Sequence, residues 1–189
     1  MGPQQSWSIY RGHGPLVQII IPLATNPKLL IFGYGNPSRG DDALGPLLLE
    51  RLETEGVSGI ECLTDFQLQV EHALDLEGRN LAFFIDAHLT CTPPYEFTLL
   101  QPELDRSYTT HAMSPAAVLQ VYQQINRRPP PPSFMLSIRG ERFELGEGLS
   151  LPAQANLDAA LQLAKLLCAR PEFSYWQSLS VRRNLQGPP

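Results

Sequence analysis

Two short runs of consecutive apolar residues constrain the fold of this chain more than any other feature. The first, residues 29–32, leads directly into a glycine-containing loop, and the second, residues 81–85, stops at Asp86. Continuous apolar runs of this length are typical of strands buried on both faces of a parallel sheet. Because parallel strands need crossover connections, we expect the rest of the chain to supply helices for both faces of such a sheet.

The remaining sequence alternates helical and extended patterns in the order that this architecture requires. Leu44, Leu48 and Leu52 recur at helical spacing, and Gly56 marks the expected end of that helix. Ser114 followed by proline is a strong helix start. The other predicted elements are strands at 60–63, 95–99 and 134–138 and helices at 67–76 and 153–169. Strands that alternate with helices in this way predict a mostly parallel sheet covered on both faces.

The chain is expected to form one domain with an extension at each end. Residues 1–27 contain four prolines and no sustained period, which predicts an irregular N-terminal extension. The domain itself is expected to cover residues 28–170, and residues 171–189 are expected to form a C-terminal tail. With 189 residues, of which 43% are hydrophobic, the domain can bury a core without disulfide bonds.

Composition narrows the classes of function. A net charge of −5 argues against a protein that coats nucleic acid. The three cysteines are far apart and form no C-x-x-C motif, so neither a disulfide framework nor a cysteine zinc site is expected, and a reducing cytoplasm is the natural location. Residues 16–24 are largely apolar, but Pro22 interrupts them and no cleavage site follows, so we expect neither a signal peptide nor a membrane span.

The loop after the first strand carries two adjacent carboxylates. Its glycines resemble a dinucleotide-binding fingerprint, but Ser38 stands where that fingerprint needs its third glycine. Asp41 and Asp42 lie at the expected start of the next helix, where the helix dipole favours the ionised carboxylate. One of the two is readily explained as a helix cap, and the second is left as a candidate cation ligand.

Three further residues are candidates for the same site. Asp86 ends the second buried strand, His88 follows two residues later, and His111 precedes the helix that starts at Ser114. Each also has a simpler explanation, as a side chain at the solvent edge of a strand or in an exposed loop. Glu71-His72 lacks the second histidine of a metallopeptidase helix, and the chain has no serine elbow or Walker loop. Acidic residues with one imidazole suit a divalent metal that keeps open coordination positions.

These motifs resemble the endopeptidases that mature nickel–iron hydrogenases. The family signature, a strand followed by G-x-G-N-x-x-x-x-D-[DE]-x-x-G, is matched by residues 33–45. The resemblance continues through Asp65 at the end of the next strand, Asp86-Ala87 after the buried strand, and Thr110-His111 before a helix. It covers residues 28–169, which is most of the chain.

The resemblance implies a three-layer α/β/α sandwich around a twisted sheet and an enzyme that removes the C-terminal extension of a hydrogenase large-subunit precursor after nickel insertion. It implies that Asp42, Asp86 and His111 bind metal. We expect nickel to be recognised in the substrate, with no tightly bound cofactor in the isolated chain, which is expected to be a monomer. Asp65 and Asp42 are the candidate catalytic residues. The residues expected in the substrate loops are Gly35, Asn36, Asp41, Phe66 and His88.

The chain departs from the family pattern at three places: its N-terminal extension, Phe66-Gln67 in place of glycines, and Gly140 where a proline is expected. The residues around Pro37 and His88 resemble the subgroup that serves cytoplasmic, NAD-linked hydrogenases. Two alternatives remain. Peptidyl-tRNA hydrolase shares the strand and Gly-x-Gly-Asn-Pro, but its catalytic Asn-His region is absent here. A non-enzymatic nucleotide-binding module would need the fingerprint that Ser38 interrupts.

Overall fold

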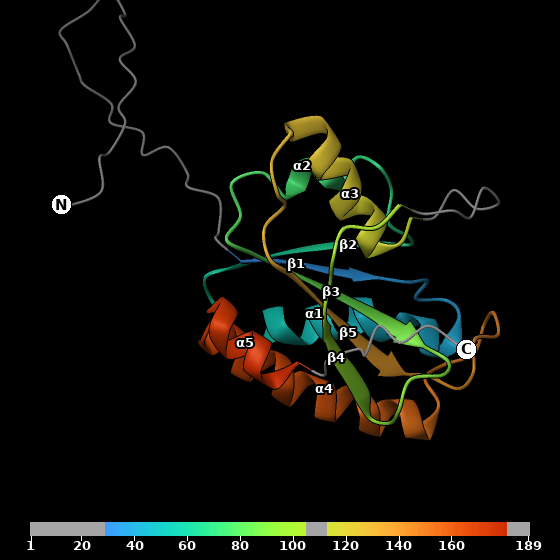
Figure 1. Cartoon of the computed structure of the whole chain (residues 1–189). Helices are drawn as coiled ribbons and strands as arrows, with labels where there is room; N and C mark the ends of the chain where they lie inside the picture. Colours follow the sequence, from blue (N-terminus) through green and yellow to red (C-terminus); the bar gives the residue numbers. More distant parts are fainter. Residues whose placement is uncertain (1–28, 105–112, 181–189) are drawn as a thin grey trace, which may run out of the picture.

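One five-stranded sheet organises the protein. The computed structural model describes residues 29–104 and 113–180. The strands lie in the order β2-β1-β3-β5-β4, and among these described strands only β4 runs antiparallel to its neighbour (Figure 1). Their bounds are β1 Leu29–Tyr34, β2 Ile60–Asp65, β3 Leu81–His88, β4 Tyr95–Leu99 and β5 Ser133–Arg139. Both apolar runs of the sequence are therefore central strands, as predicted.

Helices cover both faces of this sheet. They are α1 Leu44–Thr54, α2 His72–Asp75, α3 Pro115–Asn126, α4 Leu151–Ala169 and α5 Phe173–Leu179, with a 3-10 turn, η1 Gly40–Ala43, before α1. Helices α1, α4 and α5 lie on one face, and α2 and α3 lie on the other (Figure 1). The predicted α/β/α sandwich is confirmed. No helix among the described residues is both long and apolar enough to cross a membrane.

The two faces of the central strands bury separate apolar clusters. In β3, Phe83 and Ile85 pack toward α1 and α4, and Ala82 and Phe84 pack toward α2 and α3. This alternation follows from the two-residue period of a strand. It fixes which residues at the strand ends share a face, and so it determines which side chains can meet beyond the sheet.

Two serine caps set the start of the long helices. Ser114 accepts a hydrogen bond from the Ala117 N–H, which confirms the predicted start of α3. Ser150 caps α4 in the same way, through the Ala153 N–H. Helix α4 therefore begins at Leu151, two residues before the start that the apolar pattern alone predicts.

The predicted helix at 67–76 is wrong for most of its length, because α2 covers only His72–Asp75. The Gln69 N–H donates to the ring of His72, and the Leu68 carbonyl accepts the N–H of Met113. These two backbone groups thus bond to a side chain and to a distant segment, and the carbonyls of residues 69–71 form only tight i→i+3 turns instead of an α-helical ladder.

The expected C-terminal tail is also wrong as far as residue 180, because residues 173–179 form α5. Trp176 on this helix is fully buried, and its indole Nε1–H donates to the carbonyls of Leu167 and Arg170. Its ring packs against Phe83 and Phe134 in the core. The domain therefore extends beyond the predicted boundary, while the expected extension at 1–27 and the last residues, 181–189, lie outside the described residues.

Candidate active site

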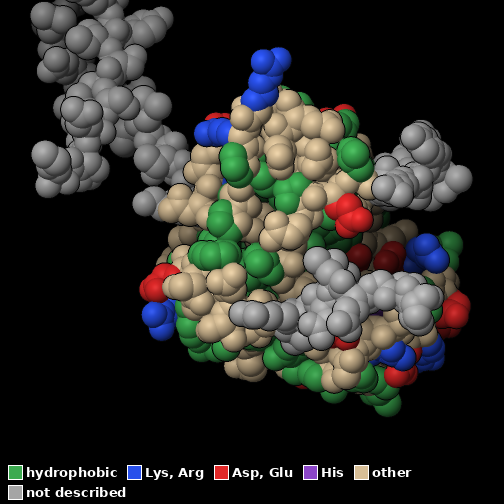
Figure 2. Space-filling model, viewed as in Figure 1, with side chains coloured by type: hydrophobic (Ala, Val, Ile, Leu, Met, Phe, Trp, Pro, Cys, Tyr) green, Lys and Arg blue, Asp and Glu red, His purple; other side chains and the backbone are tan. Residues whose placement is uncertain are grey.

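The carboxyl edge of the sheet brings chemistry-bearing side chains together. Tyr34 at the end of β1 pairs with Asp65 at the end of β2, and Gly33 pairs with Ile85, which places Asp86 beside Tyr34. Register partners in parallel strands share a face, so these three side chains form a row on the face that carries α2 and α3. Two strand spacings of about 4.8 Å separate Asp65 from Asp86. Between the α3 layer and the sheet this side of the molecule is hollowed, and acidic side chains lie in the hollow (Figure 2).

The glycine loop holds Asp42 at this edge. The Asn36 N–H donates to Asp42 Oδ2 at 2.9 Å. Gly35 has a φ of 137°, and a Cβ there would lie 2.0 Å from the Asp42 carbonyl oxygen, so only glycine fits. Neither aspartate of the pair caps α1, whose N-cap is Ala43 without a side-chain bond. Because a carboxylate occupies the loop amide, the loop is not built to cradle a phosphate.

Asp42 and Asp86 form a like-charged pair. Burial raises the pKa of Asp86 most, and the charge of Asp42 raises it further, while hydrogen bonds from the Ala87 backbone and the Tyr34 hydroxyl oppose the shift. The resulting pKa of Asp86 is about 7. Among the described residues, no basic side chain forms an ion pair with either carboxylate. Two such oxygen donors suit a divalent cation, which would offset their repulsion.

This electrostatic arrangement predicts an unusual pH dependence of stability. The pKa of Asp86 is raised in the folded protein, so the folded state binds its proton more tightly than the unfolded chain does. The free energy of unfolding should therefore fall as the pH rises from about 4 to about 7. In urea titrations without added metal, Asp86→Asn should flatten this dependence and stabilise the protein at pH 8 by roughly 1–4 kcal/mol. Glu144→Gln, an exposed carboxylate-to-amide control, should retain the wild-type profile, and an unchanged profile in Asp86→Asn would contradict the assignment.

The third residue of the implied metal set, His111, lies in residues 105–112, outside the described residues. Within the ranges that the structure does describe, no group of three His, Cys, Asp or Glu side chains is close enough to hold a metal ion. The carboxylate pair is thus the part of the predicted metal site that the structure brings together.

The placement of Asp41 in a substrate loop is wrong. Asp41 is fully buried, and its carboxylate accepts hydrogen bonds from the backbone N–H groups of Glu141, Arg142 and Ser150 and from the Ser150 hydroxyl, at 2.7–3.0 Å. Burial alone would raise the pKa of Asp41, but these donors outweigh burial and lower it. Asp41 therefore anchors neighbouring loops and does not face a ligand.

His88 shapes the turn after β3. Its ring Nδ1 accepts the N–H groups of Thr90 and Cys91, at 3.2 and 3.0 Å. A neutral imidazole has one acceptor nitrogen, and the turn uses it, so His88 is not placed to bind a cation in this arrangement. Its carbonyl accepts the Gly140 N–H, which links this turn to the end of β5.

A second polar pair lies at the end of β2. Asp65 Oδ1 accepts the Phe66 N–H, and Asp65 Oδ2 lies 3.6 Å from His72 Nε2. Because His72 Nδ1 accepts the Gln69 N–H, the neutral ring carries its proton on Nε2, toward Asp65. Sequence reasoning weighed His72 only as part of a metallopeptidase helix and missed this contact. The available signal was a histidine seven residues after a strand-ending aspartate.

A cavity of about 360 Å³ opens beside Asp65. Its lining is formed by Gly35, Pro37, Pro46, Thr64, Asp65 and Phe66. Phe66 is 66% exposed, so it presents an apolar surface to an incoming partner. The predicted substrate-loop residues Gly35 and Phe66 therefore line one cavity, with Asn36 between Gly35 and Pro37.

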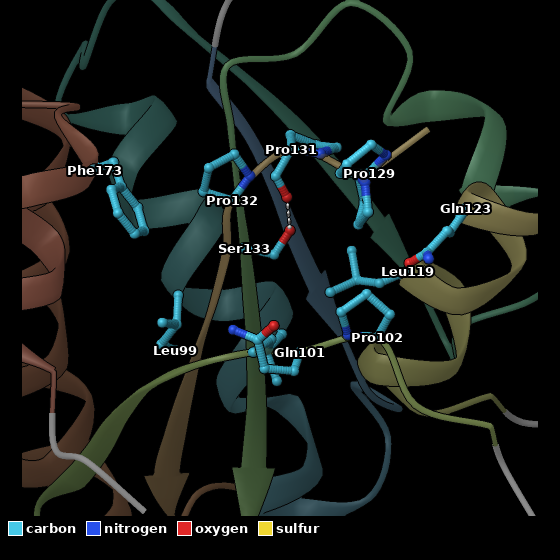
Figure 3. Close-up of a pocket in the computed structure, with 12 residues that line it drawn as sticks. Leu99, Gln101, Pro102, Leu119, Gln123, Pro129, Pro131, Pro132, Ser133 and Phe173 are labelled. Atoms are coloured by element: carbon cyan, nitrogen blue, oxygen red, sulfur yellow. Dashed lines mark hydrogen bonds between the residues drawn. The ribbon is translucent and has the colours of Figure 1, made fainter. Parts of the chain in front are cut away.

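A cavity of about 290 Å³ lies at the opposite edge of the sheet (Figure 3). Leucines, prolines, two glutamines and Phe173 line it, together with Ser133, whose hydroxyl donates to the Pro131 carbonyl (Figure 3). Among the residues that the structure describes, no titratable side chain lines this cavity, so they offer no acid, base or metal ligand there. The chemistry of the described residues concentrates at the carboxyl edge.

Comparison with known proteins identifies the fold. No protein-family model and no curated protein sequence matches the chain. The NiFe hydrogenase maturation protease HycI from Thermococcus kodakarensis KOD1 matches 78% of this chain over 96% of its own, with 19% identity and a TM-score of 0.59. The hydrogenase maturating endopeptidase HybD from E. coli aligns with 72% of this chain and 89% of its own, with 20% identity and a TM-score of 0.58. The NiFe hydrogenase maturation protease HybD from Thermococcus kodakarensis aligns with 75% of this chain and 99% of its own, with 21% identity and a TM-score of 0.57. The domain therefore has the fold of these proteases.

Proposed function

We propose that the protein is an endopeptidase that removes the C-terminal extension of a nickel–iron hydrogenase large-subunit precursor once nickel has been inserted. The observation that carries the proposal is the pairing of Asp42 with Asp86 at the carboxyl edge, in a domain with the fold of hydrogenase maturation proteases. Ligands in sheets of this kind collect beyond the carboxyl ends of the strands, where this pair lies.

Nickel enters this proposal as part of the substrate. Asp42 and Asp86, with His111 as a third ligand, would bind a nickel ion that the precursor already holds. Two carboxylates and one imidazole leave coordination positions open for the ligands that the precursor supplies. Such binding would fix the adjacent C-terminal segment at the edge of the sheet, which is catalysis by positioning.

Asp65 is the proposed group for orienting the attacking water or the peptide. Its Oδ1 is held by the Phe66 N–H, and its Oδ2 faces the His72 Nε2 proton. Both contacts restrict the carboxylate while leaving lone pairs for a ligand in the adjoining cavity. The cavity lies on the same edge as Asp42, because Gly35 contributes to its lining and also contacts Asp42.

The proposal also covers the setting of the reaction. We propose a cytoplasmic monomer without a tightly bound cofactor of its own. Its partner would be the precursor of a cytoplasmic, NAD-linked hydrogenase, because the residues around Pro37 and His88 resemble that subgroup. Size-exclusion chromatography and fractionation of cells would test the monomer and the location.

Processing should depend on nickel in the substrate and on pH. Nickel-loaded precursor should be cleaved, whereas the same precursor without nickel should be cleaved at least about 100-fold more slowly, because positioning of the scissile segment is lost. The rate should fall below about pH 7, where Asp86 takes up its proton, and further below about pH 6, since metal ligation also needs neutral His111. The measurement is cleavage of paired precursor samples between pH 5.5 and 8. Equal cleavage of the nickel-free sample would show that the protein does not recognise nickel, and only the peptidase activity of the proposal would remain.

A further inference from the structure

We propose that Asp41 is a positioning residue that sets the relative position of Asp42 and Asp86. The inference rests on the proposed function, because it takes these two carboxylates as the pair that recognises the substrate-bound nickel. Asp41 adjoins Asp42 in η1, and its own carboxylate is fully buried, so it acts on the site only through the loops that it joins.

The Asp41 carboxylate connects the glycine loop to the segment after β5. Its Oδ2 accepts the N–H groups of Glu141 and Arg142 at 2.7 and 3.0 Å, and the Asp41 N–H donates to the Arg142 carbonyl at 2.7 Å. The turn that presents Asp42 is thereby attached from two sides to residues 141–142. A shift of this segment would be transmitted to Asp42.

The same segment is attached to the strand that carries Asp86. The Gly140 N–H donates to the carbonyl of His88, the last residue of β3, at 3.2 Å. The Arg139 N–H donates to Pro94 in the loop after β3. Residues 139–142 therefore form a bridge, with Asp41 at one end and the end of β3 at the other.

Gly140 explains one departure from the pattern that the resemblance leads us to expect. Proline at this position has no N–H and could not donate to His88. A Cβ on residue 140 would also lie 2.9 Å from Asp41 Cβ and from the Phe143 ring. The tight approach of Asp41 requires the glycine, and the bond to His88 excludes a proline, so both features disfavour the expected residue at this position.

Two further hydrogen bonds, both from Ser150, tie this bridge to the α4 layer. Ser150 donates its N–H to Asp41 Oδ1 and its hydroxyl to Oδ2, while its Oγ accepts the Ala153 N–H as the cap of α4. A buried carboxylate with every bond made fixes geometry more strictly than apolar packing does. Removing one acceptor leaves a buried donor unpaired, so the loops must move apart.

The test compares Asp41→Asn with wild type at 15 °C and pH 7.5, once circular dichroism has been used to check that each protein is folded. Asn keeps the shape but turns one acceptor into a donor that faces an N–H. We expect the affinity for Ni²⁺ alone, measured by calorimetry, and kcat/KM on nickel-loaded precursor each to fall 10–100-fold. Ser150→Ala should give a smaller loss in the same direction, and Ser150→Thr should restore wild-type values.

A matched control separates positioning from stability. Val118→Ala truncates a buried side chain of α3, away from the bridge. It should lower Tm while leaving the Ni²⁺ affinity and kcat/KM within twofold of wild type. Values for Asp41→Asn within twofold of wild type would overturn the inference. A wild-type protein that leaves the precursor intact would overturn the proposed function, and the Ni²⁺ affinities of the two proteins would still decide the role of Asp41.

Discussion

Asp42→Ala is expected to lower the rate of precursor processing by more than about 100-fold. Even the loss of a residue that only hydrogen-bonds to a metal ligand typically lowers metal affinity or activity 10–100-fold. The same change should leave the protein folded. It removes one hydrogen bond, from the Asn36 N–H, at a cost of about 0.5–1.5 kcal/mol. It also removes the charge that adds to the effect of burial in raising the pKa of Asp86. The rate would be measured by the mass of the precursor over time, and the fold by circular dichroism.

The control for this prediction is Glu144→Gln. Glu144 lies in the loop between β5 and α4 and is exposed, so its loss changes the net charge as Asp42→Ala does without touching the pair. Its rate should match that of wild type. Wild-type processing by Asp42→Ala would show that the carboxylate pair does not act in the reaction, whatever the fold of the domain.

Trp176→Ala should lower the free energy of unfolding by about 3–5 kcal/mol, which is the usual cost of removing a buried aromatic side chain. The indole is fully buried in contact with Phe83, Phe97 and Phe134, and its N–H pairs with two backbone carbonyls. The truncation would leave a cavity and two carbonyls without this donor. Urea denaturation of the full chain measures the change, with the midpoint and the slope fitted separately.

Leu179→Ala, on the same helix, is the matched control. Leu179 is 40% exposed, so its truncation should cost less than about 1 kcal/mol. If α5 were a loosely attached tail, both variants would stay within about 0.5 kcal/mol of wild type. A small effect of Trp176→Ala would therefore contradict the placement of α5 in the core.

Local signals in the sequence were sufficient for the central part of the fold. The apolar runs of β1 and β3 have no polar interruption, and Ser114 with its following proline marks a helix start without help from tertiary contacts. The sheet edge that carries Asp42, Asp65 and Asp86 then follows from the topology of parallel strands. The candidate site was predictable to this extent because its residues follow directly after well-marked elements.

The remaining features depend on contacts between distant segments. Asp41 and Asp42 are adjacent and chemically identical, and only the backbone N–H groups of residues 141, 142 and 150 make the first a buried anchor. Trp176 gives no periodic signal, because a seven-residue helix with one buried side chain has no apolar stripe. The segment at 67–71 has helical spacing, but the His72 ring takes the Gln69 N–H and the Met113 N–H takes the Leu68 carbonyl. These contacts between distant segments cannot be predicted from a pattern within one segment.

The most direct test of the proposed function is the mass of a nickel-loaded hydrogenase large-subunit precursor after incubation with the purified full-length protein. We expect one cleavage that shortens the precursor at its C-terminus and releases a single peptide, whose mass equals the loss. Asp42→Ala, incubated in parallel, should leave the precursor at its original mass. An intact precursor after incubation with folded wild-type protein, or cleavage at scattered internal sites, would contradict the proposed function.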